Sequence, residues 1–383
     1  MPGANLSPVI LSLIHRAIEA RTFPGAVLLV AYNRDIVWHA AFGHATLLPV
    51  AEPMRRDTRF DLASLTKVVA TTTALMRLYD QQRFALDDRV ADFLPCFGQG
   101  GRERITIRHL LTHSSGLPAW APLYQQFDPA ELQDRRETFY ELIARLPLLS
   151  PPGRQARYSD LGFIILGAVI EALSGMPLDR FCSQHLFTPL GLDSTGYRRL
   201  PSEGQDPRAS SPSSYAATEV CPWRKRLLRG EVHDENAYAM GGVAGHAGLF
   251  GTAADLFRFT SMLLDCLDGR ASSFLSPQTV ATFTHRQGIP AGSTWALGWD
   301  TPSAQGSTAG RYFSPRSIGH TGFTGTSLWI DLLRRVTVIC LTNRVHPSRH
   351  QADLKRFRPQ LHDCIMQELR KEKLRFDKNS FLQ

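Results

Sequence analysis

Residues 60–67 read Phe-Asp-Leu-Ala-Ser-Leu-Thr-Lys and contain the single Ser-x-x-Lys pattern of the chain. Lys67 stands apart in a sequence whose positive charge is mostly arginine, because no other lysine occurs before residue 225. Arginine keeps its proton at accessible pH, whereas a buried lysine can lose it. On a helix, a spacing of three residues places the Ser64 hydroxyl and the Lys67 amine on one face. The stretch therefore predicts a serine nucleophile at a helix start, with a lysine as its base.

Length and composition describe an ordinary globular protein with room for two lobes or one large α/β domain. The chain has 383 residues, 43% of them hydrophobic and 20% charged. Its net charge of +8 is spread thinly, and the densest basic cluster is residues 224–226 with Arg229. We interpret this cluster as a solvated loop rather than a phosphate-binding patch, so nucleic acid is not an expected partner.

Cysteine spacing and the N-terminal sequence indicate in which cellular compartment the protein is expected. The six cysteines are dispersed without a C-x-x-C pair, which is typical of a reducing compartment. The N-terminus lacks the features of a signal peptide. The longest apolar run, residues 163–170, is too short for a transmembrane helix and contains Gly167. We expect a cytoplasmic protein without a membrane segment.

Two pairs of β-rich segments lie near the two ends of the chain. Residues 25–32 and 36–42 surround a short polar turn, and so do residues 326–331 and 336–341. Each pair predicts an antiparallel hairpin. A helix should begin at Ser7-Pro8, and an amphipathic segment over residues 354–369 should be interrupted by Pro359.

Helical periodicity dominates between these ends, from about residue 64 to residue 198. The pattern predicts an α/β (α+β) fold: an antiparallel sheet flanked by N- and C-terminal helices, with an inserted all-helical lobe. We assign residues 1–60 and 230–383 to the α/β lobe and residues 61–229 to the helical lobe. The two lobes together form one functional domain.

Two further elements could complete a site with Ser64 and Lys67. Tyr158-Ser159-Asp160 precedes a helical segment, and its tyrosine could shuttle protons if a nearby cation lowers its pKa. His320-Thr321-Gly322 precedes a predicted strand, where glycine lets a substrate approach the backbone closely.

In this order and spacing, the three elements resemble those of the serine β-lactamase and penicillin-binding-protein superfamily. The match is to the class C β-lactamase-like branch, which also holds DD-peptidases and family VIII-type carboxylesterases. Residues 86–90, 105–117 and 189–192 look like further segments of that family, and the similarity runs from about residue 23 to residue 343. The resemblance implies a β-lactamase/transpeptidase-like fold.

The resemblance also implies roles for individual residues. Ser64 would be the acylated nucleophile, Lys67 its partner in proton transfer, and Tyr158 the acid and base for the leaving group and the water. The backbone N–H groups of Ser64 and Phe323 would form the oxyanion hole. The implied substrate-binding and oxyanion positions are Asp160, His320, Thr321, Gly322 and Phe323. No cofactor and no metal are implied.

Asp160 departs from the family pattern, which most often has asparagine at this position. An ionised carboxylate only accepts hydrogen bonds, so it suits an acylamino carbonyl poorly. It also favours the charged form of Lys67. We therefore expect Tyr158 to carry more of the proton transfer, and penicillins to be poor substrates.

His320 stands where β-lactamases of this class usually carry lysine, and several peptidases and esterases of the branch have histidine there. An ordinary imidazole changes its charge near neutrality. The sequence therefore predicts that anionic substrates lose kcat/KM relative to neutral esters between about pH 6 and about pH 8.

A second cluster of polar residues includes His233, Asp234 and Glu235, with His246 after a glycine-rich stretch. Its spacing fits no standard zinc pattern. We interpret it as a hydrogen-bonded loop lining the cleft rather than a metal site. His113 is likewise expected to form structural hydrogen bonds.

The sequence thus predicts a serine hydrolase that cleaves an ester or amide through an acyl-serine intermediate. Its expected substrates are small esters, amides or D-amino-acid peptides. Alternatives are a DD-carboxypeptidase or penicillin-binding protein, a weak β-lactamase, or a non-enzymatic penicillin-binding sensor without turnover. The oligomeric state stays open.

Overall fold

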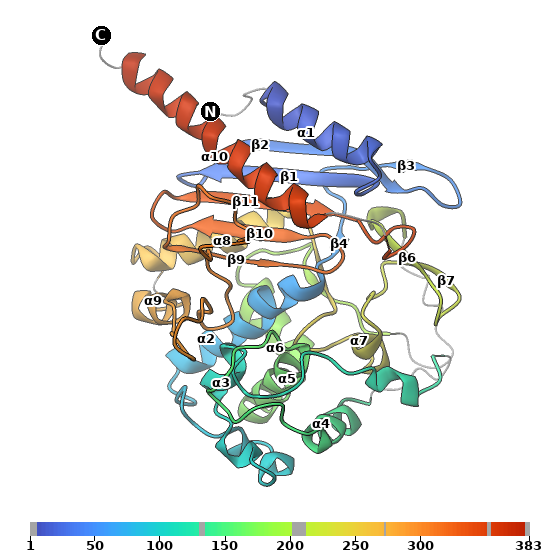
Figure 1. Cartoon of the computed structure of the whole chain (residues 1–383), viewed down its shortest axis with the longest axis vertical. Coiled ribbons are helices and arrows are strands. Elements are labelled where there is room, and N and C mark those ends of the chain that lie inside the picture. The colour runs from blue at the N-terminus through green and yellow to red at the C-terminus, as the bar shows by residue number, and fades with distance from the viewer. Residues whose placement is uncertain (1–5, 130–134, 201–211, 272, 351–353, 380–383) are drawn as a thin grey trace.

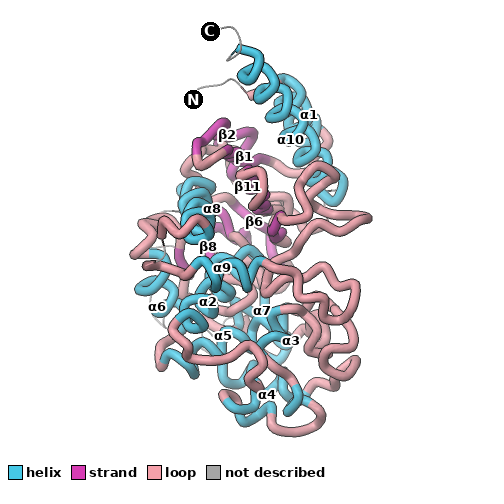
Figure 2. The backbone as a smooth tube through the Cα atoms, turned by 90° about the vertical axis from the view of Figure 1, so that its left-hand side faces the viewer, coloured by secondary structure: helices cyan, strands magenta, loops and turns pink. Residues whose placement is uncertain are grey.

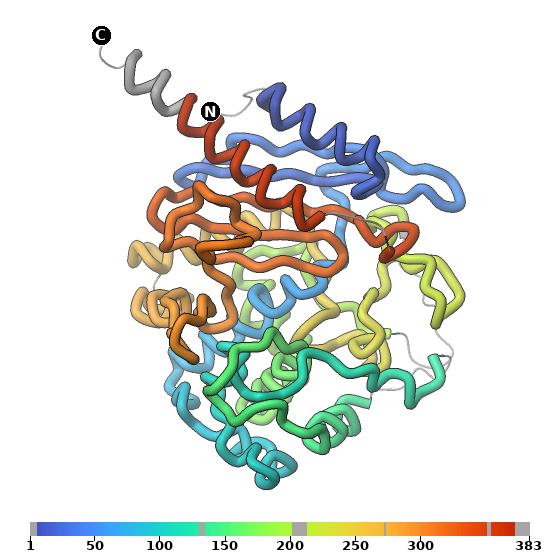
Figure 3. The backbone as a smooth tube through the Cα atoms, in the orientation of Figure 1, coloured from blue at the N-terminus to red at the C-terminus, as the bar shows by residue number. Residues whose placement is uncertain are grey.

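The sheet that organises the fold is built from both ends of the chain. The computed structural model describes residues 6–129, 135–200, 212–271, 273–350 and 354–379, with side chains up to residue 371. Six antiparallel strands run in the order β3-β2-β1-β11-β10-β9. Their bounds are β1 (Gly25–Tyr32), β2 (Asp35–Thr46), β3 (Glu52–Pro53), β9 (Ser317–Thr321), β10 (Ser327–Asp331) and β11 (Val336–Thr342). Figure 3 shows the first and last strands side by side.

Both predicted hairpins are present. Asn33 and Arg34 connect β1 to β2 with φ angles of 49° and 72°, as a tight turn between twisted strands requires. β1 pairs with β11 along its length, from Ala26 opposite Thr342 to Tyr32 opposite Val336. This pairing joins the two ends of the chain at the centre of the sheet.

Successive residues of β1 point to opposite faces of the sheet and enter two separate cores. Leu28 and Val30 pack in the outer core with α1 (Pro8–Glu19) and α10 (Leu354–Asn379). Val27 and Leu29 face the larger core, on the side covered by α8 (Ala253–Leu267). Figures 1 and 2 show α1 and α10 together on one face of the sheet. The predicted antiparallel sheet with helices from both chain ends is confirmed.

Pro359 does not interrupt the C-terminal helix, contrary to the sequence prediction. α10 continues through Pro359 from its start at Leu354. Phe357, Leu361 and Ile365 all belong to the outer core on the same helix. Because this apolar face is anchored on the sheet, its packing offsets the hydrogen bond that proline removes.

The remaining helices lie on the other side of the sheet, around one strongly apolar helix. That helix, α5 (Asp160–Ser174), is buried over most of its length. It contacts α2 (Thr73–Asp80), α3 (Ile107–Leu111), α4 (Arg136–Arg145) and α6 (Leu178–Cys182). On the same side of the sheet, α9 (Pro277–Thr284) packs against α2 and α8, and α7 (Glu235–Ala239) packs against residues 123–126. No single described helix is long and apolar enough to cross a bilayer, although α5 and the segment 178–187 together meet the length and composition criteria as a bent pair.

Short strands also occur within residues 61–229, where we expected only helices. β6 (Ala217–Cys221) and β7 (Arg226–Arg229) form a hairpin. β8 (Leu249–Gly251) pairs with both β4 (Phe60–Asp61) and β5 (Gly196–Tyr197). β4 leads directly into the Ser-x-x-Lys stretch, so this small sheet helps to position the nucleophile.

Asn343 provides a test of how the chain ends hold together. Its Oδ1 accepts a hydrogen bond from Gly25 N at 3.0 Å, and its Nδ2 donates to Ala45 O at 3.0 Å. Asn343→Ala leaves these buried backbone groups without partners, so we expect a loss of about 2–4 kcal/mol in unfolding free energy, measured by urea denaturation. The exposed Gln305→Ala serves as the control and should change stability by less than about 0.5 kcal/mol. A matching loss in both variants would contradict this role.

Candidate active site

The nucleophile segment has an unusual local structure rather than the regular helix start that we predicted. Ser64 lies in a 3₁₀ turn (Ala63–Leu65), which is followed by a π-helical segment (Lys67–Thr72) before α2 begins. Ala63 has a φ of 47°, in the left-handed region that L-residues avoid, and its N–H donates to Asp61 Oδ1 at 2.9 Å. π-helical turns and strained residues both concentrate at functional sites.

The Lys67 amine lies at the centre of the predicted site. Its side chain is completely buried, and Nζ donates to Ser64 Oγ at 3.0 Å, Asp160 Oδ1 at 2.6 Å and His246 O at 3.1 Å. Burial lowers the pKa of Lys67, and the nearby carboxylates of Asp160 and Asp234 offset only part of that effect. The amine therefore releases its proton more easily than a solvent-exposed lysine.

Tyr158 contacts the same serine, since its hydroxyl donates to Ser64 Oγ at 2.8 Å. Burial, together with the Asp160 carboxylate, raises the pKa of Tyr158 well above its ordinary range. The expectation that a nearby cation lowers this pKa is therefore wrong, while the expectation that Tyr158 carries more of the proton transfer stays a prediction. In the free protein the phenol is protonated, which suits it as a proton donor and leaves Lys67 as the base.

The backbone on either side of Tyr158 is fixed by hydrogen bonds. Ser159 caps α5 by accepting from Gly162 N at 3.1 Å, and its own N–H donates to His113 Nδ1 at 3.1 Å. The His113 ring lies 4.8 Å from the Tyr158 ring, and its pKa is far below the ordinary value because it is buried. His113 is thus a neutral structural hydrogen-bond acceptor, as predicted.

The turn between β9 and β10 is bonded directly to the nucleophile segment. Thr324 Oγ1 donates to Asp61 O at 2.8 Å, and Thr326 Oγ1 donates to Leu62 O at 2.9 Å. At Gly322, a Cβ atom would lie 2.7 Å from Leu62 O, so only glycine fits. The two threonines were not predicted as part of the site, although their alternation with glycine in the stretch 322–326 is typical of a hydrogen-bonded turn.

His320 lies in β9 and faces the site, but it does not have the charge that we predicted. Burial lowers the pKa of His320 to about 3. Nδ1 lies 3.0 Å from Thr321 O, the position of a donor to that carbonyl, and Nε2 has no partner among the described residues. The rings of Tyr158 and Trp295 lie 5.9 Å and 6.2 Å away. The imidazole is therefore neutral at physiological pH, and sequence pattern alone did not reveal its burial.

One cavity of about 590 Å³ brings the predicted site residues together, with Lys67 buried beneath it. The predicted residues that line it are Ser64, Tyr158, Asp160, His320, Thr321, Gly322 and Phe323. The lining residues missed from the sequence are Trp295, Asp300, Arg344, Leu354, Lys355 and Arg358. These come from loops and from the start of α10, where no motif marks them.

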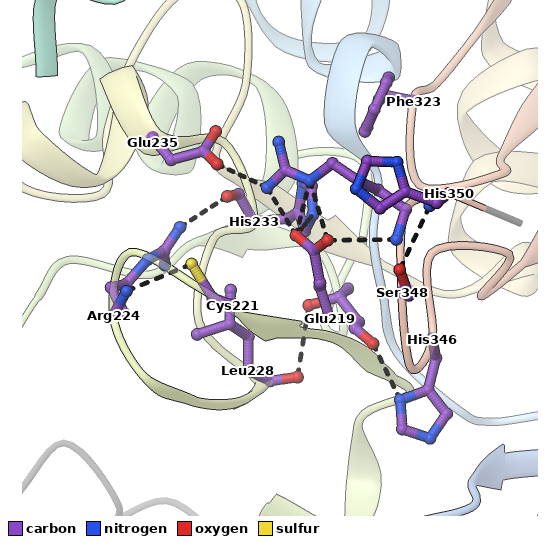
Figure 4. A network of polar contacts seen from close by, with 12 residues as sticks. Glu219, Cys221, Arg224, Leu228, His233, Glu235, Phe323, His346, Ser348 and His350 are labelled. Atoms are coloured by element: carbon purple, nitrogen blue, oxygen red, sulfur yellow. Dashed lines mark hydrogen bonds and ion pairs between the residues drawn. The ribbon is translucent and has the colours of Figure 1, made fainter. Parts of the chain in front are cut away.

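Phe323 is held at the rim of this cavity by a second polar network. Its ring is half exposed and stacks against the His233 ring at 5.6 Å. His233 Nε2 lies 3.0 Å from Glu219 Oε2, and Arg349 contacts the same carboxylate. Although burial opposes it, these hydrogen bonds lower the pKa of Glu219 to about 2. Figure 4 shows Phe323, His233 and Glu219 in this network.

The polar cluster around residue 234 is hydrogen-bonded. Asp234 caps α7 and lies 2.9 Å from His246 Nε2, and the carbonyl of His246 accepts from Lys67. The described residues include no group of three or more side chains arranged to hold a metal ion. Arg224, which we interpreted as part of a solvated loop, is buried and donates to Glu231 and to the carbonyl of Val232.

Comparison with known proteins identifies the family. The Beta-lactamase family model matches residues 11–361. The chain belongs to the beta-lactamase family. It is 35% identical over 362 residues to the N-acetylmuramyl-L-alanine amidase of Bacillus subtilis (strain 168), covering 87% of this chain and 80% of that protein. A protein of Escherichia coli (strain K12), provisionally named D-alanyl-D-alanine carboxypeptidase, is 33% identical over 353 residues, or 85% of this chain and 79% of its own length.

Solved structures agree with this assignment. EstCE1, a hydrolase with promiscuous acyltransferase activity, is 26% identical, with a TM-score of 0.72 covering 93% of this chain and 97% of its own. The octameric penicillin-binding protein homologue from Pyrococcus abyssi shares the fold at 20% identity, with a TM-score of 0.66 over 88% of this chain and 73% of its own. Members of the family with amidase, carboxypeptidase and esterase names match most of this chain, and it is a serine hydrolase.

The Lys67–Asp160 contact predicts a pH effect in this beta-lactamase-family site. The Asp160 carboxylate raises the pKa of Lys67, so Asp160→Asn should lower that pKa further and increase the deprotonated fraction at a given pH. We expect the acidic limb of the kcat/KM profile for a neutral ester to move to lower pH. The remote Asp179→Asn is the control. A shift to higher pH, or none, would contradict Lys67 as the base.

The neutral His320 imidazole gives a second prediction, which replaces the one drawn from the sequence. With a pKa of about 3, His320 carries no charge above about pH 5 and cannot lose one near neutrality. The ratio of kcat/KM for an anionic ester to that for its neutral analogue should stay constant between about pH 6 and about pH 8. A fall in this ratio that His320→Gln abolishes would show that His320 is charged in that range.

Proposed function

We propose that the chain hydrolyses small esters and amides, including D-amino-acid amides and peptides, through an acyl intermediate on Ser64. One observation carries the proposal: Ser64 Oγ lies 3.0 Å from Lys67 Nζ and 2.8 Å from Tyr158 Oη on the floor of a cavity of about 590 Å³. A hydroxyl between a base of lowered pKa and a protonated phenol has both groups that acyl transfer needs.

Acylation follows from this geometry. Lys67, in its uncharged form, accepts the proton of Ser64 as Oγ attacks the substrate carbonyl carbon. The N–H groups of Ser64 and Phe323, neither of which has an acceptor among the described residues, are the proposed donors to the oxyanion. Tyr158 then gives its proton to the leaving oxygen or nitrogen as the bond to the acyl carbon breaks.

Deacylation returns both protons to their starting positions. The Tyr158 phenolate takes a proton from water, and the resulting hydroxide attacks the acyl carbon. As the second tetrahedral intermediate collapses, Ser64 Oγ leaves and takes back its proton from the Lys67 ammonium. The ammonium lies 5.0 Å from the centre of the Tyr158 ring, close enough to stabilise the transient phenolate.

The size of the cavity and its polar lining support the proposal that the substrates are small and carry polar groups. Asp160 accepts a hydrogen bond from Lys67 and is therefore engaged, which supports the proposal that acylamino substrates such as penicillins are handled poorly. A DD-carboxypeptidase activity is the second candidate, because Arg344 and Lys355 line the cavity and could meet a substrate carboxylate.

Cytoplasmic location remains a proposal, supported by six free cysteines. A DD-carboxypeptidase would need export to reach peptidoglycan.

A substrate panel tests the proposed function. Short-chain p-nitrophenyl esters, D-amino-acid amides, a D-alanyl-D-alanine peptide and a chromogenic cephalosporin are assayed with the wild-type protein and Ser64→Ala. We expect steady turnover of esters or D-amino amides, loss of all turnover in Ser64→Ala, and a kcat lowered about 10²- to 10⁴-fold in Tyr158→Phe.

Two outcomes would contradict the proposal. One-time labelling by a fluorescent penicillin without turnover of any substrate would favour the non-enzymatic sensor. Ester turnover that persists in Ser64→Ala would place the nucleophile elsewhere.

A further inference from the structure

Arg358 is a partly buried cation whose hydrogen bonds, among the described residues, go to backbone carbonyls rather than to a carboxylate. It lies near the start of α10 and reaches the β9–β10 turn, where Nη2 donates to Gly322 O at 2.8 Å and to Thr326 O at 2.9 Å. Nε is buried and has no partner among the residues that the structure describes, and burial lowers the pKa of Arg358 to about 10, which keeps it charged at neutral pH. A charge largely removed from water, with no carboxylate bonded to it in the described part of the chain, costs stability, so stability alone does not account for its position.

The carbonyl that Arg358 contacts belongs to a particular peptide group. Gly322 C=O and Phe323 N–H are the two ends of one planar peptide unit. Because the unit is planar, fixing the carbonyl oxygen on one side also fixes the direction of the N–H on the other. A charged donor at the oxygen further polarises the amide and makes its N–H a stronger donor. The Phe323 N–H is the group that we propose as an oxyanion donor.

We propose that Arg358 is a positioning residue, which orients and polarises the Gly322–Phe323 peptide for stabilising the oxyanion. This inference rests on the proposed acyl-serine function. Arg344, the neighbouring cation, donates to Phe323 O at 2.9 Å and so contacts the following peptide instead. Of these two arginines, only Arg358 acts on the peptide unit whose N–H faces the oxyanion.

The competing role for Arg358 is direct binding of a substrate carboxylate, since its side chain also lines the cavity. The two roles differ in what they require of the substrate. A positioning residue affects the transition state of every substrate, neutral ones included, and so changes kcat. A carboxylate-binding residue affects only anionic substrates and acts largely through KM.

The experiment measures kcat and KM of Arg358→Met and Arg358→Lys on a neutral p-nitrophenyl ester and on an ester that carries a carboxylate. For Arg358→Met we expect kcat to fall about 10- to 100-fold on both esters, with KM changed less than about threefold, and Arg358→Lys to be intermediate. The matched control is Arg334→Met, because Arg334 also donates to a backbone carbonyl, Tyr312 O at 2.6 Å, near the far end of β10. It should keep wild-type kcat.

A boronic acid inhibitor provides a second readout that a purely structural role would not change. Its boron bonds to Ser64 Oγ, the serine proton passes to Lys67, and the tetrahedral anion places an oxygen against the two N–H groups. In Arg358→Met its affinity should fall in parallel with kcat, while the thermal melting curve shows a folded protein.

Each alternative result has a distinct meaning. A wild-type protein inactive on every ester would overturn the proposed function itself. An active wild type with Arg358→Met within twofold of its kcat, or a loss confined to the KM of the anionic ester, would overturn only the role of Arg358. If Arg358→Met does not fold, Arg358→Lys decides, because the shorter lysine side chain carries its ammonium at a different position from Nη2, which makes both hydrogen bonds. A kcat reduced threefold or more at unchanged KM then supports the role, and wild-type kcat overturns it.

Discussion

The site depends on one buried amine. Lys67 Nζ donates at once to a hydroxyl, a carboxylate and a backbone carbonyl, which belong to Ser64, Asp160 and His246. These partners come from three separate segments of the chain, so the amine joins them as well as serving the serine. Burial lowers the pKa of Lys67 and the Asp160 carboxylate raises it, and burial is the larger effect.

The fold explains how Lys67 is buried while its partner Ser64 lines a cavity that is open to substrate. α5 is buried over most of its length, and it brings Tyr158 and Asp160 to the site at its capped N-terminus. On the opposite side, the β9–β10 turn is bonded to the nucleophile segment through Thr324 and Thr326. Because β9 to β11 pair with the N-terminal hairpin, both ends of the chain are needed to close the site.

Much of this could be predicted from the sequence, because periodicity and motif spacing are local properties. The hairpins and the proximity of Ser64 to Lys67 follow from patterns of a few residues, whereas the gathering of Tyr158 and His320 in one cavity was expected only from the resemblance to a known family. What failed depends on three-dimensional surroundings. The pKa of His320 and of Tyr158 is set by burial, which no motif records.

The same limit applies to the other errors and omissions. Pro359 lies within a continuous helix because that helix packs on a sheet formed by distant residues. Arg358 sits in an unremarkable basic stretch, and only the folded chain places it behind the Gly322 carbonyl. The assignment of residues to two lobes remains a prediction.

The central claim is that Lys67 loses its proton more easily than an ordinary lysine, and NMR can measure this directly. The chain has only six lysines, so ¹³C-labelling at Cε gives few signals, and Lys67→Arg assigns the relevant one. We predict that the Lys67 signal titrates at lower pH than those of the other lysines. Titration together with them, or at higher pH, would contradict the account.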